Sequence, residues 1–441
     1  MQKFTFNSPK ITKAAVIFPD VYSQHNSLDS QYRLQEACGL AYAINLEVVY
    51  QDIIKIRQTK AATFIGQGII NQLKDIISNQ EIDLIIFDTN LTPIQQRNLE
   101  NQLSCKVIDR TALILEIFGE RAQTKEGKLQ VELAHLTYQR SRLVRSWTHL
   151  ERQRGGGGFL GGPGETQIEL DRRLIDEKII RIKKSLEKVK NTRAVQRQSR
   201  QNDNCPIVAL VGYTNAGKST LFNLLSQSSV LAKDMLFATL DTTMRQIKLP
   251  SGNQIILSDT VGFISSLPHE LIMAFRSTLE EAVHADIILH IRDISSQNSK
   301  SQRTDVIDTL ENIGLNKINY SDKYIEVLNK SDLLSSEKKE KISRHLRKNQ
   351  VLVSSLKSDG IDNLLSLIDA KLSKNHQTIQ CQLNLSEGKT LSWIYDNMQV
   401  ISIKQNEQNY NMTLKGTAEN LAKLLQKGGI KKLIKVSKIS N

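Results

Sequence analysis

A loop that could bind phosphate is the strongest chemical pattern in this chain of 441 residues. An apolar run at 207–211 leads into the order G-x-x-x-x-G-K-S, formed by Gly212, Tyr213, Thr214, Asn215, Ala216, Gly217, Lys218 and Ser219. In such loops backbone N–H groups surround the β-phosphate of a nucleotide, the lysine bridges the β- and γ-phosphates, and the serine hydroxyl ligates Mg²⁺. A strand before the loop and a helix after it make the pattern specific. The pattern therefore predicts a nucleotide site.

Two further apolar runs end in polar residues that suit the same ligand. The run at 255–258 is followed by Asp259, Thr260, Val261 and Gly262. A carboxylate at this place can hold Mg²⁺ through water, and the Gly262 N–H can reach a γ-phosphate. The run at 325–328 is followed by Asn329, Lys330, Ser331 and Asp332. Guanine presents two adjacent donors, N1–H and the 2-amino group, which the Asp332 carboxylate can accept together, so we expect guanine selection.

A fourth strand-like run, at 351–353, is followed by Ser354, Ser355 and Leu356, which could brace the base. Each of the four polar clusters comes directly after a predicted strand. Ligands of open α/β sheets bind at the carboxyl ends of the strands. We therefore expect an α/β domain in which these four clusters meet at one guanine-nucleotide site.

This part of the chain resembles the GTPase domain of the translation-factor-related class. The resemblance assigns 212–219 to the phosphate loop, 259–262 to the second switch, 329–332 to the guanine motif and 354–356 to the base-bracing loop. The usual sequence of that last loop is Ser-Ala-Lys, from which Ser-Ser-Leu departs.

Three other stretches are similar to the HflX family. They are 161–173, 259–269 and a stretch that resembles the first switch, which contains Phe237, Ala238, Thr239, Leu240 and Asp241 and has Thr242 where a proline is common. In that family the threonine matching Thr239 ligates Mg²⁺ when GTP is bound. The resemblance implies catalytic roles for Lys218, Thr239 and Gly262, and Ser219 and Thr239 as ligands of Mg²⁺. It also implies hydrolysis of GTP to GDP, binding to the large ribosomal subunit and its RNA, and separation of stalled ribosomes into subunits.

Changes of periodicity divide the chain into four segments. In 1–120 apolar runs at 15–18, 46–50, 62–65, 84–88 and 106–109 alternate with helical patterns, which is typical of a parallel α/β sheet. Residues 121–204 are predicted to form a helical hairpin and 205–375 the GTPase domain. Residues 376–441 are predicted to form a small α/β module, with helices at 390–397 and 418–426 and strands at 399–403 and 409–414.

The hairpin is predicted from two seams of apolar residues. The first helix carries Leu129, Leu133, Leu136, Leu143, Trp147 and Leu150 at steps of three and four, with Arg140 in the missing position. The second carries Ile175, Ile179, Ile182, Leu186 and Val189. Each helix has one narrow apolar stripe to bury, so the two should pack antiparallel. Between them the Gly-rich stretch 155–164 is expected to be non-helical, either as a flexible linker or as an ordered loop.

Most of the chain's excess positive charge lies in this hairpin. The whole chain carries a net charge of +13, and residues 139–203 contain 16 Lys or Arg against 8 Asp or Glu, a net of +8. Solvated helix faces usually mix the two signs, whereas Arg140, Arg142, Arg145, Arg152 and Arg154 accumulate around one acid, Glu151. We therefore expect the hairpin to contact RNA rather than only to solubilise the chain.

Cysteine spacing and hydropathy indicate the kind of environment in which the protein works. The four cysteines are far apart and form no C-x-x-C pair, which favours reduced thiols in a cytoplasmic protein. No apolar run approaches the ~18 residues of a membrane span, so we expect no stable insertion into a bilayer. Peripheral recruitment through the lysine-rich segment 427–438 stays open as a minor alternative. We expect the chain to be a monomer.

One alternative concerns catalysis. Related switches often place a water-orienting glutamine directly after Asp-x-x-Gly, but Phe263 stands there. The first hypothesis is a GTPase whose cycle drives ribosome remodelling. The second is an RNA-binding or ribosome-binding adaptor that holds GTP as a structural ligand with little hydrolysis.

Overall fold

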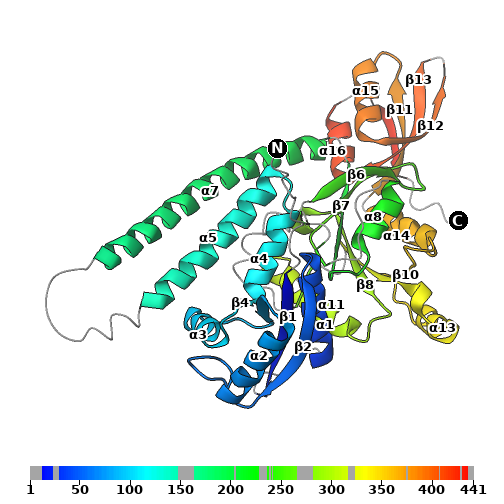
Figure 1. Ribbon diagram of the computed structural model, residues 1–441. Helices are drawn as coiled ribbons and strands as arrows, with labels where there is room; N and C mark the ends of the chain where they lie inside the picture. Colours follow the sequence, from blue (N-terminus) through cyan, green and yellow to red (C-terminus); the bar gives the residue numbers. More distant parts are fainter. Residues whose placement is uncertain are drawn as a thin grey trace, which may run out of the picture.

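The described part of the chain forms three sheets and one long helical hairpin (Figure 1). The computed structural model describes residues 12–22, 29–147, 163–202, 205–227, 236–237, 240, 242–265, 282–315, 323–373, 376–406, 408–427 and 430–435. The hairpin projects away from the sheets, and the C-terminal sheet lies beyond the middle one (Figure 1). The expected α/β class is confirmed. Among the described residues, no helix combines the length and apolar character needed to cross a bilayer.

The N-terminal sheet is parallel and has the strand order β2-β1-β3-β4. The order reverses at β1, because β2 lies on one side of it and β3 and β4 on the other. Helices α1 and α4 pack on the face that contains Phe18, whereas α2 and α3 pack on the face that contains Ile17. The elements are β1 (Lys13–Val21), α1 (Ser30–Ala43), β2 (Glu47–Ile56), α2 (Gln67–Gln80), β3 (Leu84–Phe87), α3 (Pro93–Leu103), β4 (Lys106–Asp109) and α4 (Arg110–Arg121).

The strand expected at 62–65 is wrong. Lys60 and Phe64 exchange backbone hydrogen bonds of 3.1 and 2.8 Å across a tight turn, and Phe64 has a φ of 64°. A residue in the left-handed region closes a turn and does not continue a strand. Phe64 and Ile65 are nevertheless buried in the core beside Ile70. The apolar run therefore predicts the burial of these side chains correctly, but it does not predict their backbone conformation.

Helices α5 (Lys125–Trp147) and α7 (Pro163–Asn202) pack together as the predicted hairpin (Figure 1). Arg140, in the missing seam position, forms an ion pair of 3.1 Å with Asp176 on α7. Pro163 and Gly164, predicted to be non-helical, are the first two residues of α7, and proline suits a first turn because its missing N–H needs no partner there. The rest of the Gly-rich stretch lies outside the described residues. The packed seam residues are Leu129, Leu133, Leu136, Ile175, Ile179, Ile182 and Leu186.

The middle sheet has the order β10-β9-β8-β5-β7-β6 and is parallel except for β6. Cores on both of its faces bury the central strands, as parallel sheets require. The carboxyl ends of its parallel strands consequently meet at one edge. The elements are β5 (Ile207–Gly212), α8 (Lys218–Ser226), β6 (Thr243–Lys248), β7 (Gln254–Asp259), β8 (Ile287–Asp293), α11 (Ser299–Asn312), β9 (Tyr324–Asn329), the 3-10 helix η1 (Ser331–Leu333), α13 (Ser336–Arg344), β10 (Gln350–Leu352) and α14 (Ile361–Ser373).

The C-terminal sheet is antiparallel, with the order β12-β13-β11-β14. The two helices and two strands predicted in this module are confirmed. The sequence did not predict β11 or β14, and β14 places residues 430–435 of the lysine-rich segment in a strand paired with β11. The elements are β11 (His376–Asn384), α15 (Gly388–Asn397), β12 (Gln399–Gln405), β13 (Asn409–Thr417), α16 (Ala418–Gln426) and β14 (Ile430–Lys435).

The predicted segment boundaries stay predictions. The first, at 120/121, falls at the last residue of α4. The other two, at 204/205 and 375/376, fall between α7 and β5 and between α14 and β11.

The hairpin seam generates a prediction with a matched control one residue away. Ile179 is 4% exposed in the seam, whereas Ile180 is 54% exposed on the same helix. We expect Ile179→Ala to lower the free energy of local opening of α5 and α7 by about 2 to 4 kcal/mol, because it leaves a cavity in the seam. Ile180→Ala should change it by less than about 0.5 kcal/mol. Hydrogen exchange of the hairpin amides measures both values, and equal effects would show that the seam does not hold the helices together.

Candidate nucleotide site

The predicted phosphate loop joins the end of β5 to the start of α8, and its glycines are required by geometry. Gly217 has a φ of 92°, and a Cβ atom there would lie 2.3 Å from Asn329 Nδ2. A Cβ atom on Gly212 would lie 2.2 Å from the carbonyl oxygen of Ile291. No side chain fits at such distances, so both positions need glycine. The loop is thereby pressed against β8 and β9.

Lys218 and Ser219 begin α8 and face the end of β7. The Lys218 ammonium donates to the carbonyl oxygens of Gly212 at 3.1 Å and Tyr213 at 2.8 Å. Burial lowers the pKa of Lys218 to about 8, against the opposing effect of the Asp259 charge. The Ser219 hydroxyl donates to Asp259 Oδ2 at 2.8 Å. A cation near phosphates and a hydroxyl beside a carboxylate are therefore in place together.

The second switch, a name that from here on covers residues 259–265, packs against the phosphate loop. Phe263 donates its N–H to the Gly212 carbonyl at 3.1 Å, and its own carbonyl accepts the Thr214 N–H at 2.7 Å. Gly262 lies so close that an added Cβ atom would be 2.9 Å from Lys218 Nζ. The Thr260 hydroxyl donates to the Leu210 carbonyl at 2.6 Å. The Phe263 and Val261 side chains are buried in the core shared with the N-terminal sheet.

Asn329 connects three of the four predicted clusters. Its amide donates to the Ala216 carbonyl in the phosphate loop at 2.9 Å. Its side-chain oxygen accepts the Ser355 N–H at 3.0 Å and the Ser355 hydroxyl at 2.9 Å. The side chain is buried, so it holds the phosphate loop and the base loop at a fixed distance.

Asp332 and Ser354 meet beside this connection. The Ser354 hydroxyl donates to Asp332 Oδ1 at 2.6 Å, and this bond lowers the pKa of Asp332, which favours its ionised form. Lys330 has a left-handed φ of 62° and pairs with Asp293 at 2.9 Å. Ser331 is buried, and its N–H donates to the Val353 carbonyl. The Leu356 side chain is 78% exposed, so in this conformation it does not pack in the core.

The first-switch prediction can be followed only in part. Phe237 and Leu240 are buried in the core that joins the middle and N-terminal sheets, and Phe237 contacts Phe118 edge-on at 4.8 Å between ring centroids. Their side chains therefore point into that core. Ala238, Thr239 and Asp241 lie outside the described residues, so the role predicted for Thr239 stays a prediction.

The residues present fit a magnesium nucleotide. The hard oxygen donors of Ser219 and Asp259 are the kind that Mg²⁺ takes, with phosphates and water as its remaining ligands. The Thr214 hydroxyl is buried and has no hydrogen-bond partner among the described residues. Gly212 and Gly217 leave no room for side chains in this loop, and glycines of this kind let backbone N–H groups approach a phosphate.

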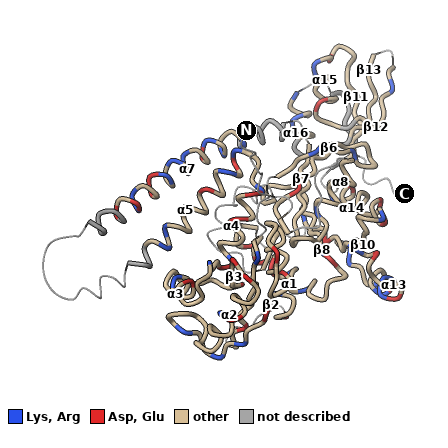
Figure 2. Tube along the Cα trace, viewed as in Figure 1, with Lys and Arg blue, Asp and Glu red and all other residues tan. Residues whose placement is uncertain are grey.

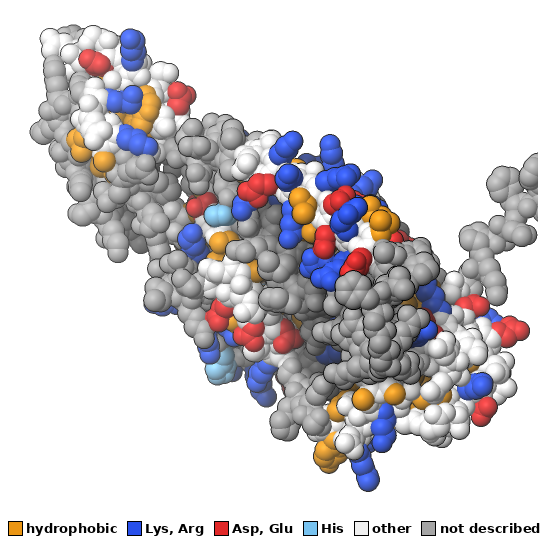
Figure 3. Space-filling model, turned by 90° about the vertical axis from the view of Figure 1, so that its left-hand side faces the viewer, with side chains coloured by type: hydrophobic (Ala, Val, Ile, Leu, Met, Phe, Trp, Pro, Cys, Tyr) orange, Lys and Arg blue, Asp and Glu red, His pale blue; other side chains and the backbone are white. Residues whose placement is uncertain are grey.

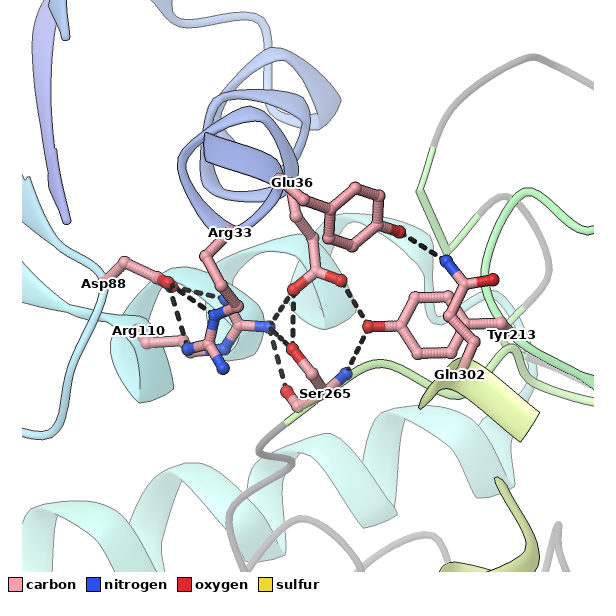
Figure 4. Close-up of polar contacts among 8 residues, drawn as sticks. Arg33, Glu36, Asp88, Arg110, Tyr213, Ser265 and Gln302 are labelled. Atoms are coloured by element: carbon pink, nitrogen blue, oxygen red, sulfur yellow. Dashed lines mark hydrogen bonds and ion pairs between the residues drawn. The ribbon is translucent and has the colours of Figure 1, made fainter. Parts of the chain in front are cut away.

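Sequence reasoning missed a buried polar cluster that joins the N-terminal sheet to this site (Figure 4). We call it the interdomain cluster, and it consists of Arg33, Glu36, Asp88, Arg110, Tyr213 and Ser265. Its members come from distant segments, and the hydrogen-bonded pair Ser265 and Glu36 is 229 residues apart. No local spacing signals such a contact. The sequence marked Tyr213 only as a position in the phosphate loop.

Family models match this chain along most of its length. The descriptions are "GTP-binding GTPase N-terminal" for residues 31–119, "GTP-binding GTPase Middle Region" for 121–200, "50S ribosome-binding GTPase" for 207–330 and "HflX C-terminal domain" for 339–433. A crystal structure of a GTP-binding protein from Sulfolobus solfataricus in complex with GDP is 24% identical, with a TM-score of 0.43, and covers 82% of this chain and 99% of that one.

Curated relatives share both the sequence and the extent of the chain. The GTPase HflX of Magnetococcus marinus is 47% identical over 378 residues, which cover 86% of this chain and 86% of that protein. The GTPase HflX of Escherichia coli is 42% identical over 352 residues, which cover 80% of this chain and 81% of that protein. With these matches and a P-loop domain in the middle of the chain, this protein belongs to the HflX family of GTPases.

Proposed function

We propose that the chain binds GTP with Mg²⁺ at the edge of the middle sheet, hydrolyses it, and uses the cycle to remodel ribosomes through their large subunit. The main support for this proposal is the connection through Asn329, which joins the phosphate loop to the guanine-motif and base loops. Lys218 would stabilise charge on the transferring phosphoryl group, and the Gly262 N–H would contact the γ-phosphate. Ser219 and Asp259 would hold Mg²⁺, together with Thr239. The metal would neutralise phosphate charge.

Guanine selection would come from Asp332. The Ser354 hydroxyl fixes one carboxylate oxygen, and the same bond lowers the pKa of Asp332, which favours the ionised form. An ionised carboxylate is an acceptor only, which suits the two donors of guanine and rejects the donor–acceptor pattern of adenine.

The water-positioning group would come from outside the second switch. Phe263 is 2% exposed and packs in the core, so its side chain cannot reach an attacking water. Lys218 supplies charge stabilisation without positioning a nucleophile. We therefore infer that the free chain hydrolyses GTP slowly and that the ribosome orders the missing group.

The hairpin would supply the contact with ribosomal RNA. Two of the arginines that the sequence analysis proposed for this contact are engaged elsewhere. Arg142 pairs with Asp109 at 2.6 Å and stacks on Tyr138, and Arg140 pairs with Asp176. Both are therefore engaged in internal contacts. The side chain of Arg145, and the whole of Arg152 and Arg154, lie outside the described residues.

Exposed lysines on α7 remain available for a polyanion. Lys183, Lys184 and Lys188 are exposed on the half of α7 nearer its carboxyl end. Acidic residues alternate with basic ones along the helix (Figure 2), and both signs gather on the side toward which the hairpin projects (Figure 3), as solvated helix faces usually do. The proposal of RNA contact therefore depends on the exposed lysines and not on an unmixed basic face. The family model described as a 50S ribosome-binding GTPase supports the same partner, the large subunit. In its more specific form, the proposal is that the chain splits stalled ribosomes into their subunits.

The adaptor alternative is favoured by one observation. Phe263 ties the second switch to the phosphate loop by two backbone hydrogen bonds, which would stabilise a single conformation. A chain that stayed in that conformation would hold nucleotide without turnover.

The first prediction here concerns the base. Asp332→Asn should weaken GTP binding by about a hundredfold or more and let xanthosine triphosphate compete, because the new amide offers a donor where guanine also has one. Competition binding with both nucleotides measures this. Asp362→Asn, an exposed acid in the first turn of α14, is the matched control and should bind as the parent does. An unchanged preference for GTP in Asp332→Asn would contradict the guanine assignment.

The second prediction concerns RNA. Reversing Lys183, Lys184 and Lys188 to Glu should weaken ribosome binding at least about tenfold and lower its salt dependence, since each lost phosphate contact removes roughly one unit of the log–log slope. Nucleotide affinity should not change. The same reversal at Lys338, Lys341 and Lys348, exposed on and after α13, is the control for net charge. If both triple variants lose binding equally, the effect is one of total charge and the hairpin assignment is wrong.

The third prediction concerns the rate. Single-turnover hydrolysis of GTP should be slow in the free protein and about a hundredfold faster or more with large ribosomal subunits, because positioning of the nucleophile contributes several kcal/mol. A fast intrinsic rate that subunits do not change would refute the inference from Phe263. Absence of hydrolysis under both conditions would support the adaptor.

A further inference from the structure

Part of the same chain lies where the strand order of the N-terminal sheet reverses, a place that we call the crevice. Open α/β sheets bind ligands outside the carboxyl ends of their strands at the point where strand order reverses. Here β1 and β3 flank that point. Asp88 directly follows β3, and α1 contributes Arg33 and Glu36 to the same place. Tyr213 of the phosphate loop and Ser265 of the second switch lie against them (Figure 4).

The crevice is built around the buried guanidinium of Arg110, the first residue of α4. It pairs with Asp88 and with Glu36, the latter at 2.6 Å, and all three side chains are at most 2% exposed. One of its nitrogens also donates to the Ser265 carbonyl at 2.9 Å. A buried cation needs such acceptors. The second switch therefore supplies the guanidinium with an acceptor in addition to the two carboxylates of the N-terminal part.

Glu36 and Tyr213 extend this site onto the phosphate loop. The Tyr213 hydroxyl donates to Glu36 and accepts the Ser265 N–H at 2.7 Å. The Ser265 hydroxyl donates to the other oxygen of Glu36 at 2.9 Å. Burial, and then the Glu36 charge, raise the pKa of Tyr213, so the hydroxyl keeps the proton that it donates. Both the backbone and the side chain of Ser265 are thus recognised.

The position of Ser265 determines what the preceding residues do. With Ser265 held in the crevice, Phe263 pairs with Gly212 and Thr214, and Gly262 rests against Lys218. The Thr214 N–H is then directed to the Phe263 carbonyl, and the Lys218 ammonium to two loop carbonyls. The β-phosphate that GTP and GDP share would draw Lys218, whereas only the γ-phosphate would draw the Gly262 N–H toward itself. GTP therefore competes with the contacts that Gly262 and Phe263 make in this arrangement, whereas GDP, which lacks the γ-phosphate, leaves them in place.

We propose that the crevice of the N-terminal sheet is a binding site for the second switch, in which Arg110, Glu36 and the Tyr213 hydroxyl hold a docked conformation that favours GDP over GTP. These three are positioning residues, since they act through Ser265 and not on the nucleotide. The inference rests on the proposed function. By linkage, weakening the docking must raise affinity for a GTP analogue more than affinity for GDP.

The test compares two nucleotides on the full-length chain. Affinities for fluorescent GDP and for a fluorescent non-hydrolysable GTP analogue are measured with Mg²⁺ for the parent, Tyr213→Phe and Ser265→Ala. Tyr213→Phe keeps the ring and the loop backbone and removes one hydroxyl, while Ser265→Ala keeps both backbone contacts. We expect each to raise the ratio of analogue affinity to GDP affinity about fivefold or more.

Tyr32→Phe is the matched control. The Tyr32 hydroxyl, on α1 one turn before Glu36, accepts a hydrogen bond of 2.5 Å from Gln302 on α11. The same Tyr→Phe change there removes a hydroxyl hydrogen bond from the same interface, and among the described residues that hydroxyl bonds to neither the phosphate loop nor the second switch. Its affinity ratio should match that of the parent. A ratio that moves in Tyr213→Phe and not in Tyr32→Phe cannot arise from a loss of stability alone.

The outcomes separate the inference from the function on which it rests. If the parent binds neither nucleotide, the proposed function fails and the inference with it. If the parent binds both and the ratio is unchanged or lowered in Tyr213→Phe and Ser265→Ala, the coupling alone is overturned. A rise of equal size in Tyr32→Phe would also overturn it, because any weakening of the interface would then suffice.

Discussion

The buried charge of Arg110 is the constraint on which the arrangement of the two α/β parts depends. Asp88 and Glu36 neutralise it, and the Ser265 carbonyl satisfies a further donor. Leaving a buried donor without its acceptor costs about 1 to 3 kcal/mol. The Ser265 carbonyl therefore favours the arrangement in which the second switch lies against the N-terminal sheet. The apolar core around Phe118, Phe237 and Phe263 runs through the same contact and adds burial to the polar match.

The nucleotide site depends on close approach of the backbone, and not on a buried charge. Gly217 leaves room for Asn329, and Gly262 leaves room for Lys218. Each pair brings a strand-end cluster onto the phosphate loop without an intervening side chain. Tyr213 belongs to both systems, because its backbone forms the loop and its hydroxyl meets Glu36. In the proposed coupling, Tyr213 and Ser265 together connect the phosphate loop to Glu36 on α1.

The sequence predicted what local pattern determines. The phosphate loop, the strand ends around Asp259 and Asn329, and the seam at Leu136 and Ile179 all follow from spacing and periodicity, and the structure places them as expected. Prediction from the sequence failed where a contact with a residue far along the chain determines the structure. Arg142 was counted as free charge although Asp109 binds it, and β14 forms because β11 offers an edge. Glu36 and Tyr213 are 177 residues apart, so no pattern could join them.

Hydrogen exchange in the N-terminal helices tests the central claim, that the nucleotide is sensed by the N-terminal sheet. Amides of 30–43 and 110–121 would be followed in the full chain with GDP and with a non-hydrolysable GTP analogue. The account predicts slower exchange there with GDP, because the docked second switch closes the crevice, and no difference between the nucleotides in Tyr213→Phe. Identical exchange with the two nucleotides in the parent chain, with the nucleotide site saturated in each case, would contradict it.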